Sequence, residues 1–294
     1  NFTIFSNAIA CLRNNLKIKP IDCNKFDWNM NIESILKNIT SKTKLIIATH
    51  IYNYPFQIEK LIKICKQKKI ILMEDAAENF GQVYKNKMCG SFGDISTYSF
   101  YANKQITTGE GGMITTNYKH LYEKASNLRN LSFGKVDRFN HEDISSNYRM
   151  SNIQASLGLS QLKRIKTIVK KRHLIGEEYY KYLSVNKNIY MPMPKKNNVK
   201  NIYWVVGILI VNTKLNFNAK YVMNELKKKN IGTRPFFWPM HRQKMLKKMS
   251  FYNSKQFPNS DYISNYGFYL PSSLTLTKSK IKYISKCVNE IINL

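Results

Sequence analysis

Residues 74–116 read EDAAENFGQVYKNKMCGSFGDISTYSFYANKQITTGEGGMITT. An acidic pair opens this stretch, and Lys104 precedes a cluster of glycines in its second half. The run Lys69–Met73 predicts a short buried strand directly before it, which places Asp75 at the carboxyl end of that strand. Open α/β sheets bind ligands at this end of their strands. A carboxylate and a lysine that each follow a strand therefore predict a site.

A turn, a second strand and a glycine cluster follow within the same stretch. Gly90–Gly93 is expected to form the turn, Ile95–Phe100 the strand, and Lys104 lies in the loop after that strand. The glycines of residues 109–112 are expected to let the backbone approach whatever Lys104 binds, because a residue without Cβ permits close approach.

Strand and helix patterns alternate along the first half of the chain. This alternation predicts an α/β fold with a mostly parallel sheet, right-handed crossovers and helices on both faces. The expected strands cover residues 16–21, 43–50, 69–73 and 95–100, and the expected helices cover residues 28–39, 57–68 and 119–131.

The second half predicts a smaller α+β domain. Its apolar spacing predicts one long bridging helix over residues 150–183, after which residues 191–200 (MPMPKKNNVK) break the pattern. We therefore expect a large domain over residues 1–165 and a small C-terminal domain over residues 166–294. The other elements expected there are a strand over residues 203–211 and helices over residues 218–229 and 278–292.

The composition is that of a globular protein. The chain has 294 residues, of which 43% are hydrophobic and 13% aromatic, enough to bury a full core. No apolar run approaches the roughly 18 to 20 residues of a membrane span, and the first residues lack the pattern of a signal peptide. The five cysteines are scattered without CxxC spacing, which argues against disulfides and against a zinc site. We expect a cytoplasmic enzyme with no metal and no membrane contact.

The formal charge of +29, from 47 Lys and Arg against 18 Asp and Glu, would ordinarily suggest a nucleic-acid partner. The lysines are spread along nearly every expected helix, and the chain is rich in Asn, Ile and Tyr, as products of AT-rich coding sequences are. This distribution favours compositional bias over a nucleic-acid surface. A basic surface would still attract a phosphorylated or nucleotide-bearing substrate.

The residue types around Lys104 suit one class of cofactor chemistry. A lysine in a pocket forms a Schiff base with an aldehyde cofactor or a carbonyl substrate. Pyridoxal phosphate (PLP) also needs an acid beside its ring nitrogen, a stacking side chain and donors for its phosphate. Asp75 could supply the acid and Phe2 the stacking ring. Ser99 and Arg149 could supply part of the phosphate site. Simpler readings stay open, with Lys104 a surface lysine and Asp75 a helix cap.

Several motifs resemble the DegT/DnrJ/EryC1/StrS family of PLP-dependent nucleotide-sugar aminotransferases. Those similar to its cofactor core are Glu74–Glu78, Gly90–Asp94, Ser99–Lys104 and Thr107–Met113. Those similar to its dimer-contact segment are Asn147–Ile153 and Gly158–Leu162, and those similar to its C-terminal lobe are Thr233–His241 and Leu270–Ser273. The resemblance covers nearly the whole chain in the family's order. It implies a PLP-dependent transferase of fold type I.

The resemblance implies a role for each matching residue. Lys104 would bind PLP as a Schiff base and, once released, act as the base that moves a proton. Asp75 would pair with the pyridinium nitrogen, and Phe2 would stack on the ring. Ser99 would bind the phosphate together with Arg149 from a partner subunit, so that a homodimer would share its active sites.

Three further residues match positions near the substrate. Glu78 matches a position close to the cofactor and the sugar, and Arg234 and His241 are expected to meet the substrate or the amino donor. Capping or packing is the alternative for Arg234 and His241. Burial in the core is the alternative for Phe2, packing within its strand is the alternative for Ser99, and a surface ion pair is the alternative for Arg149.

A lysine at position 104 implies amino transfer, because relatives that deoxygenate sugars have histidine there. Glutamate would donate the amino group, and a keto group on a nucleotide-linked deoxysugar would receive it. Three segments are most similar to those of perosamine synthases, which aminate C4 of GDP-4-keto-6-deoxymannose. They are SFYANKQITTGEGGM, NYRMSNIQ and TRPFFWPMH. Enzymes of dTDP- and UDP-linked 4-keto sugars are the near alternatives. A catalytically silent relative that acts as a binding module is the alternative from another class.

The chain departs from the family pattern in two places. Family members begin well before the position that matches Asn1, so we expect the N-terminal part to be missing. That part includes a turn that helps to bind the cofactor phosphate at a helix N-terminus. Asn53 stands where the family commonly has glycine, a change expected to strain a loop.

Overall fold

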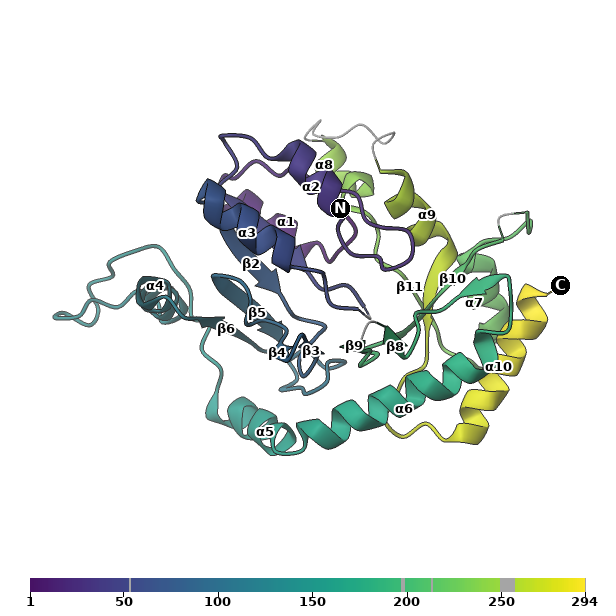
Figure 1. Ribbon diagram of the computed structural model, residues 1–294. Helices are drawn as coiled ribbons and strands as arrows, with labels where there is room; N and C mark the ends of the chain where they lie inside the picture. The colour runs from purple at the N-terminus through teal and green to yellow at the C-terminus, as the bar shows by residue number, and fades with distance from the viewer. Residues whose placement is uncertain (53, 197–198, 213, 249–256, 294) are drawn as a thin grey trace. The chain divides into compact units, whose positions relative to one another are not determined.

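The computed structural model describes the chain except residues 53, 197–198, 213, 249–256 and 294 (Figure 1). The described residues form two compact units. The central unit comprises residues 44–48 and 58–166, and the terminal unit comprises residues 1–43, 49–57 and 167–294. The division into domains of residues 1–165 and 166–294 stays a prediction. Asn53 lies outside the described residues.

The sheet of the central unit carries three of the predicted strands. Its strands are β1 (Leu45–Thr49), β2 (Ile71–Asp75), β5 (Ile95–Ser99) and β6 (Gly112–Thr116), in the order β1-β2-β5-β6. β2 and β5 run parallel, with Asp75 beside Thr97. β5 and β6 run antiparallel, with Ser99 beside Gly112. The α/β class is therefore confirmed, with an antiparallel strand beside β5.

Helices of the central unit lie where the sequence predicts them near residues 57–68 and 119–131. α3 (Glu59–Lys68) contacts β2, and α4 (Lys119–Arg129) contacts β6. The other elements of this unit are the paired β3 (Val83–Tyr84) and β4 (Lys87–Met88), and α5 (Asn152–Leu162).

The single helix predicted over residues 150–183 is wrong, because two helices occupy this segment. α5 begins at a capping box in which Ser151 and Gln154 bond each other's backbone N–H groups. It ends in a tight turn, where the N–H of Arg164 donates to the Gln161 carbonyl at 2.9 Å. α6 (Ile165–Leu183) then begins. The apolar spacing continues across this turn, so the spacing alone does not locate it.

The terminal unit is built on a second sheet in the order β11-β12-β10-β7, with antiparallel pairing throughout. All five residues of β10 are buried, and α6, α7 and α10 supply most of the apolar side chains of the surrounding core. The strand and helices predicted after residue 200 are confirmed. The elements are β7 (Ile189–Tyr190), β8 (Lys195–Lys196), β9 (Val199–Lys200), β10 (Val206–Ile210), α7 (Ala219–Lys228), β11 (Arg234–Pro235), η1 (Met240–Arg242), α8 (Lys244–Lys248), α9 (Pro258–Tyr266), β12 (Gly267–Leu270) and α10 (Lys278–Ile292).

Two elements predicted near the start of the chain differ in the structure. Residues 16–21 form no strand, because no described strand offers them a hydrogen-bonded neighbour, and a strand is stabilised by such a neighbour. The helix predicted over residues 28–39 is shorter, since Trp28 has a left-handed φ of 61°. It becomes α2 (Ile32–Asn38), capped by the Asn31 side chain, and α1 (Ser6–Arg13) precedes it.

Candidate functional site

Asp75 and Glu78 lie together at the carboxyl end of β2. Asp75 is the last residue of the strand, and its Oδ1 accepts the N–H of Ala77 at 3.2 Å. Both carboxylates are about as buried as core residues, each with 4% of its surface exposed. Buried carboxylates need partners that stabilise their charge, so this end of the strand suits a positively charged group.

Lys104 interacts electrostatically with both of these carboxylates. It is half-buried, and burial lowers its pKa below the ordinary value of a lysine. The charges of Glu78 and then Asp75 act in the opposite direction and raise the pKa. A lysine with a lowered pKa has a larger share of neutral amine, which is the form that attacks a carbonyl. The structure thus brings together three residues that the sequence singles out.

Glu74 is a residue whose role the sequence analysis missed. Its side chain is fully buried and accepts N–H groups from Gly90 at 2.8 Å, Phe92 at 2.5 Å and Gly93 at 2.6 Å. The carboxylate thereby fixes the predicted turn of residues 90–93 against β2. Strand alternation is the signal that could have found this role, because adjacent residues Glu74 and Asp75 must point to opposite faces of the sheet.

Replacing Glu74 with alanine is expected to lower the free energy of unfolding by about 3 kcal/mol or more, since each buried N–H left without an acceptor costs about 1–3 kcal/mol. Urea denaturation measures this change. Glu110→Ala, which removes the same charge from an exposed position, is the matched control and is expected to be near neutral. Equal stability of the two variants would contradict the anchoring role of Glu74.

Side chains from α5 hold the loop that follows Lys104. The Gln161 amide accepts the N–H of Thr107 at 3.1 Å and donates to the carbonyl of Thr107 at 2.7 Å. Gln154 donates to the carbonyl of Glu110 at 3.1 Å. Long-range pairing of this kind has no local sequence signal. α5 is therefore a positioning element for the lysine loop.

The glycines after Lys104 serve local packing. Gly111 has a φ of 150°, and a Cβ there would lie 2.4 Å from Thr108 Oγ1. A Cβ at Gly112 would lie 2.8 Å from the carbonyl oxygen of Tyr98. Contacts within the protein thus already require glycine at these two positions. Close approach of a ligand to this backbone stays a prediction.

The two residues predicted to bind phosphate occupy different surroundings in the central unit. Ser99 ends β5, and its hydroxyl accepts the N–H of Tyr101 at 3.2 Å. Arg149 is exposed, and its Nε donates to Asn147 Oδ1 at 3.0 Å. Across the described residues Arg149 makes no ion pair, so the alternative of a surface ion pair is not observed. Phosphate binding by both residues stays a prediction.

Phe2 is buried in an aromatic cluster of the terminal unit. Its ring lies edge-on to Tyr52, with 5.8 Å between centroids, and 6.0 Å and 6.2 Å from the rings of Phe236 and Phe237. This is the core burial that is the alternative role of Phe2. Stacking of its ring on a cofactor stays a prediction.

His241 and Arg234, also in the terminal unit, differ in burial. His241 is buried, with Nδ1 2.9 Å from the Asn1 side chain, Nε2 3.0 Å from Asp261 and its ring stacked on Phe257. Burial lowers its pKa below the ordinary value, while Asp261 acts to raise it. These contacts fit a packing role for His241. Arg234 is exposed on β11. Substrate contact by either residue stays a prediction.

The described residues include neither a membrane-spanning helix nor a cluster of metal ligands. Every helix in the described part of the chain is too short or too polar to span a membrane. The described side chains also include no group of three or more His, Cys, Asp or Glu that could hold a metal ion. The cysteines Cys11, Cys23, Cys65, Cys89 and Cys287 are all unpaired thiols.

The sequence profile of the DegT/DnrJ/EryC1/StrS aminotransferase family matches residues 1–289. The GDP-perosamine synthase of Escherichia coli O157:H7 is 35% identical over 270 residues, which span 92% of this chain and 71% of that protein. The GDP-perosamine synthase of Vibrio cholerae is 33% identical over 265 residues, which span 90% of this chain and 71% of that protein.

Solved structures share the fold. Helicobacter pylori PseC, an aminotransferase involved in the biosynthesis of pseudoaminic acid, superposes with a TM-score of 0.93 at 24% identity, over 99% of this chain and 78% of that one. The PLP-form of Streptococcus pneumoniae Spr1654 superposes with a TM-score of 0.91 at 19% identity, over 99% of this chain and 79% of that one.

Proposed function

The chain belongs to the DegT/DnrJ/EryC1/StrS aminotransferase family of PLP-dependent enzymes, and on that premise we propose that it aminates the 4-keto group of a nucleotide-linked 4-keto-6-deoxysugar, with glutamate as the donor. The observation that carries the proposal is the half-buried Lys104 beside the buried carboxylates of Asp75 and Glu78. These three residues bring a nucleophilic amine and two carboxylates together.

These residues fit PLP. When bound, PLP supplies an electron sink that stabilises negative charge on the carbon losing a proton. Lys104 would hold it covalently through Nζ, and the same amine, once released, would accept and return the proton. Asp75, buried at the end of β2, would keep the ring nitrogen protonated. Phe2, Ser99 and Arg149 are the proposed remaining cofactor contacts.

Glu78 is expected to tune the amine of Lys104. Its negative charge stabilises the ammonium form and so raises the pKa of Lys104, against the larger effect of burial. Glu78→Gln removes the charge and should lower that pKa further, so that neutral amine is present at lower pH. The pH dependence of PLP attachment to the full-length apoprotein should shift downward by up to about one unit.

Borohydride trapping followed by mass spectrometry at Lys104 measures this shift. Glu110→Gln, which changes an exposed carboxylate, is the control. A shift to higher pH in the Glu78 variant would contradict the assigned sign.

The proposed substrate is a GDP-linked sugar of the perosamine type, supported by the two relatives named GDP-perosamine synthase. The alternatives are dTDP- and UDP-linked 4-keto sugars, since relatives with those nucleotides in their names match at lower identity. Arg234 and His241 are kept as proposed substrate contacts. A panel of GDP-, dTDP- and UDP-4-keto-6-deoxysugars with glutamate tests the proposal by mass spectrometry of the amino sugar. Amination of none of them would overturn it.

We place the reaction in cytoplasmic biosynthesis of a surface polysaccharide or other glycan. One matching relative is a spore coat polysaccharide biosynthesis protein of Bacillus subtilis, which supports this assignment. The alternative of a silent module that binds nucleic acid predicts salt-sensitive RNA or DNA binding without amino transfer.

The active enzyme is proposed to be a homodimer. α5 and the segment before it expose large apolar side chains, and Ile144, Ile153, Leu157 and Leu159 each have more than half of their surface exposed. Exposed apolar patches of this kind commonly mark protein interfaces. A second copy suits this surface because exposed Arg149 lies beside it and is proposed to complete the partner's phosphate site.

Mixing two inactive variants tests whether sites are shared. Arg149→Ala and Lys104→Ala should each be nearly inactive, but in half of the heterodimer sites an intact Lys104 meets an intact Arg149. Refolding the full-length variants together at equal amounts should restore about a quarter of wild-type activity. Formation of heterodimers, seen by native mass spectrometry, without recovered activity would contradict a shared site.

A further inference from the structure

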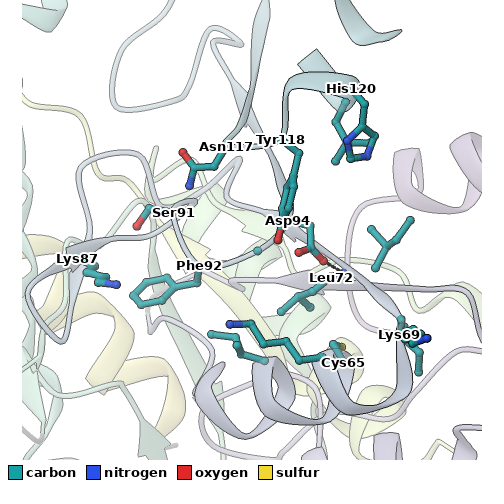
Figure 2. Close-up of a pocket in the computed structure, with 16 residues that line it drawn as sticks. Cys65, Lys69, Leu72, Lys87, Ser91, Phe92, Asp94, Asn117, Tyr118 and His120 are labelled. Atoms are coloured by element: carbon teal, nitrogen blue, oxygen red, sulfur yellow. Dashed lines mark hydrogen bonds between the residues drawn. The ribbon is translucent and has the colours of Figure 1, made fainter. Parts of the chain in front are cut away.

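A hollow of about 570 Å³ lies in the central unit at the end of β2 away from Asp75 (Figure 2). Ile71, the first residue of β2, lines it, whereas Asp75 is the last residue of that strand. Ile71 and Asp75 are four residue steps apart along the strand, a separation of about 13 Å. The hollow is therefore distinct from the group formed by Lys104, Asp75 and Glu78.

The lining combines an apolar floor with a cationic rim. Leu72, Phe92 and the ring of Tyr118 supply apolar surface, as Figure 2 shows. The lysines of the rim are Lys66, Lys69 and Lys87, all exposed.

One acid, Asp94, lies in the lining and offsets one of these three charges. Asp94 accepts the N–H of Leu72 at 2.8 Å and a hydrogen bond from the Tyr118 hydroxyl, which raises the pKa of that tyrosine. The three rim lysines form no ion pair with any residue that the structure describes. The hollow therefore presents three lysines against one carboxylate, a net positive lining beside apolar surface, and such a lining attracts a polyanion with a flat apolar part.

The volume narrows the class of ligand. Pockets for small organic ligands measure about 300–1,000 Å³, so this hollow has room for much more than a bare phosphate. A nucleotide matches both features, since its base can lie on the apolar floor and its phosphates can meet the lysines.

One wall of the hollow is connected to the candidate site. Phe92 and Gly93 line the hollow, and their N–H groups are held by the Glu74 carboxylate. Glu74 is the chain neighbour of Asp75. A ligand that displaces this turn changes the hydrogen bonds of the Glu74 carboxylate. Because Glu74 directly precedes Asp75, binding in the hollow can in this way affect the candidate site.

We propose that this hollow is an effector site for a nucleoside diphosphate, separate from the substrate site and coupled to it through Glu74. The existence of the site does not depend on the proposed reaction. Its occupant is an effector because the hollow lies at the opposite end of β2 from Lys104.

Equilibrium dialysis of the full-length holoenzyme with labelled GDP counts the sites. Wild type should bind two GDP per chain, one at the substrate site and one in the hollow. Lys66→Gln with Lys69→Gln and Lys87→Gln should weaken one of the two by about tenfold or more. The matched control changes three exposed lysines of α3 that do not line the hollow, Lys60, Lys63 and Lys68, to glutamine and should keep both sites.

The outcomes separate this inference from the proposed reaction. If the reaction is wrong and no substrate site exists, wild type binds one GDP and only the hollow variant loses it. Equal weakening in both triple variants would assign the effect to overall charge and overturn the proposal. Competition by inorganic phosphate as strong as by GDP would overturn the nucleotide class. Unchanged binding in the hollow variant, with its melting temperature preserved, would overturn the site itself.

Discussion

Replacing Lys104 with alanine is expected to lower amino transfer by roughly 10³-fold or more, because one side chain performs two tasks. In the proposed reaction it would hold the cofactor and, once released, would move the proton. Burial favours both tasks by lowering the pKa of the lysine, and the neighbouring carboxylates keep that pKa from falling further. No other residue of the group formed by Lys104, Asp75 and Glu78 carries an amine.

The measurement is a single turnover of full-length protein with glutamate and PLP. The variant should also lack the absorbance band at the edge of the visible that a lysine-bound PLP gives. Lys63→Ala, on the exposed side of α3, is the control for loss of a lysine. Activity of the Lys104 variant within tenfold of wild type would contradict the assignment.

Replacing Asp75 with asparagine is expected to lower the rate by roughly 10²-fold or more, because a neutral amide cannot hold the ring nitrogen of PLP in its protonated form. The change is nearly isosteric, and the amide oxygen can still accept the N–H of Ala77. The variant should therefore fold and still attach PLP at Lys104. It should fail in the later proton transfer.

Separate rates of attachment and of turnover distinguish this result from simple unfolding. Asp143→Asn, at an exposed position, is the matched control. An Asp75 variant that attaches PLP and turns over at the wild-type rate would show that the carboxylate does not serve the ring nitrogen.

Local patterns predicted most of the regular structure. The strands around Ile46, Leu72 and Ser96 and the helix of residues 278–292 lie where apolar runs and helical spacing place them. The failures concern information that is not local. Residues 16–21 have the composition of a strand but no hydrogen-bonded neighbour, and the break between α5 and α6 falls inside continuous apolar spacing.

The site was predictable to the extent that its residues follow strands. Asp75 and Lys104 stand out in the sequence because each closely follows an apolar run, at the edge where α/β sheets bind ligands, and the structure brings them together. Glu74 and Gln161 were missed because their partners lie far along the chain or on another helix. The burial of Phe2 among aromatic rings likewise depends on residues that are distant in the sequence, so the spacing of residues does not predict it.

The central claim is that Lys104 is the residue that binds PLP. Borohydride reduction of the full-length protein with PLP, followed by proteolysis and mass spectrometry, locates the attached cofactor directly. The account predicts one PLP per chain on the peptide that contains Lys104, with none after Lys104→Ala. Attachment of PLP mainly to another lysine, in protein that transfers amino groups, would contradict it.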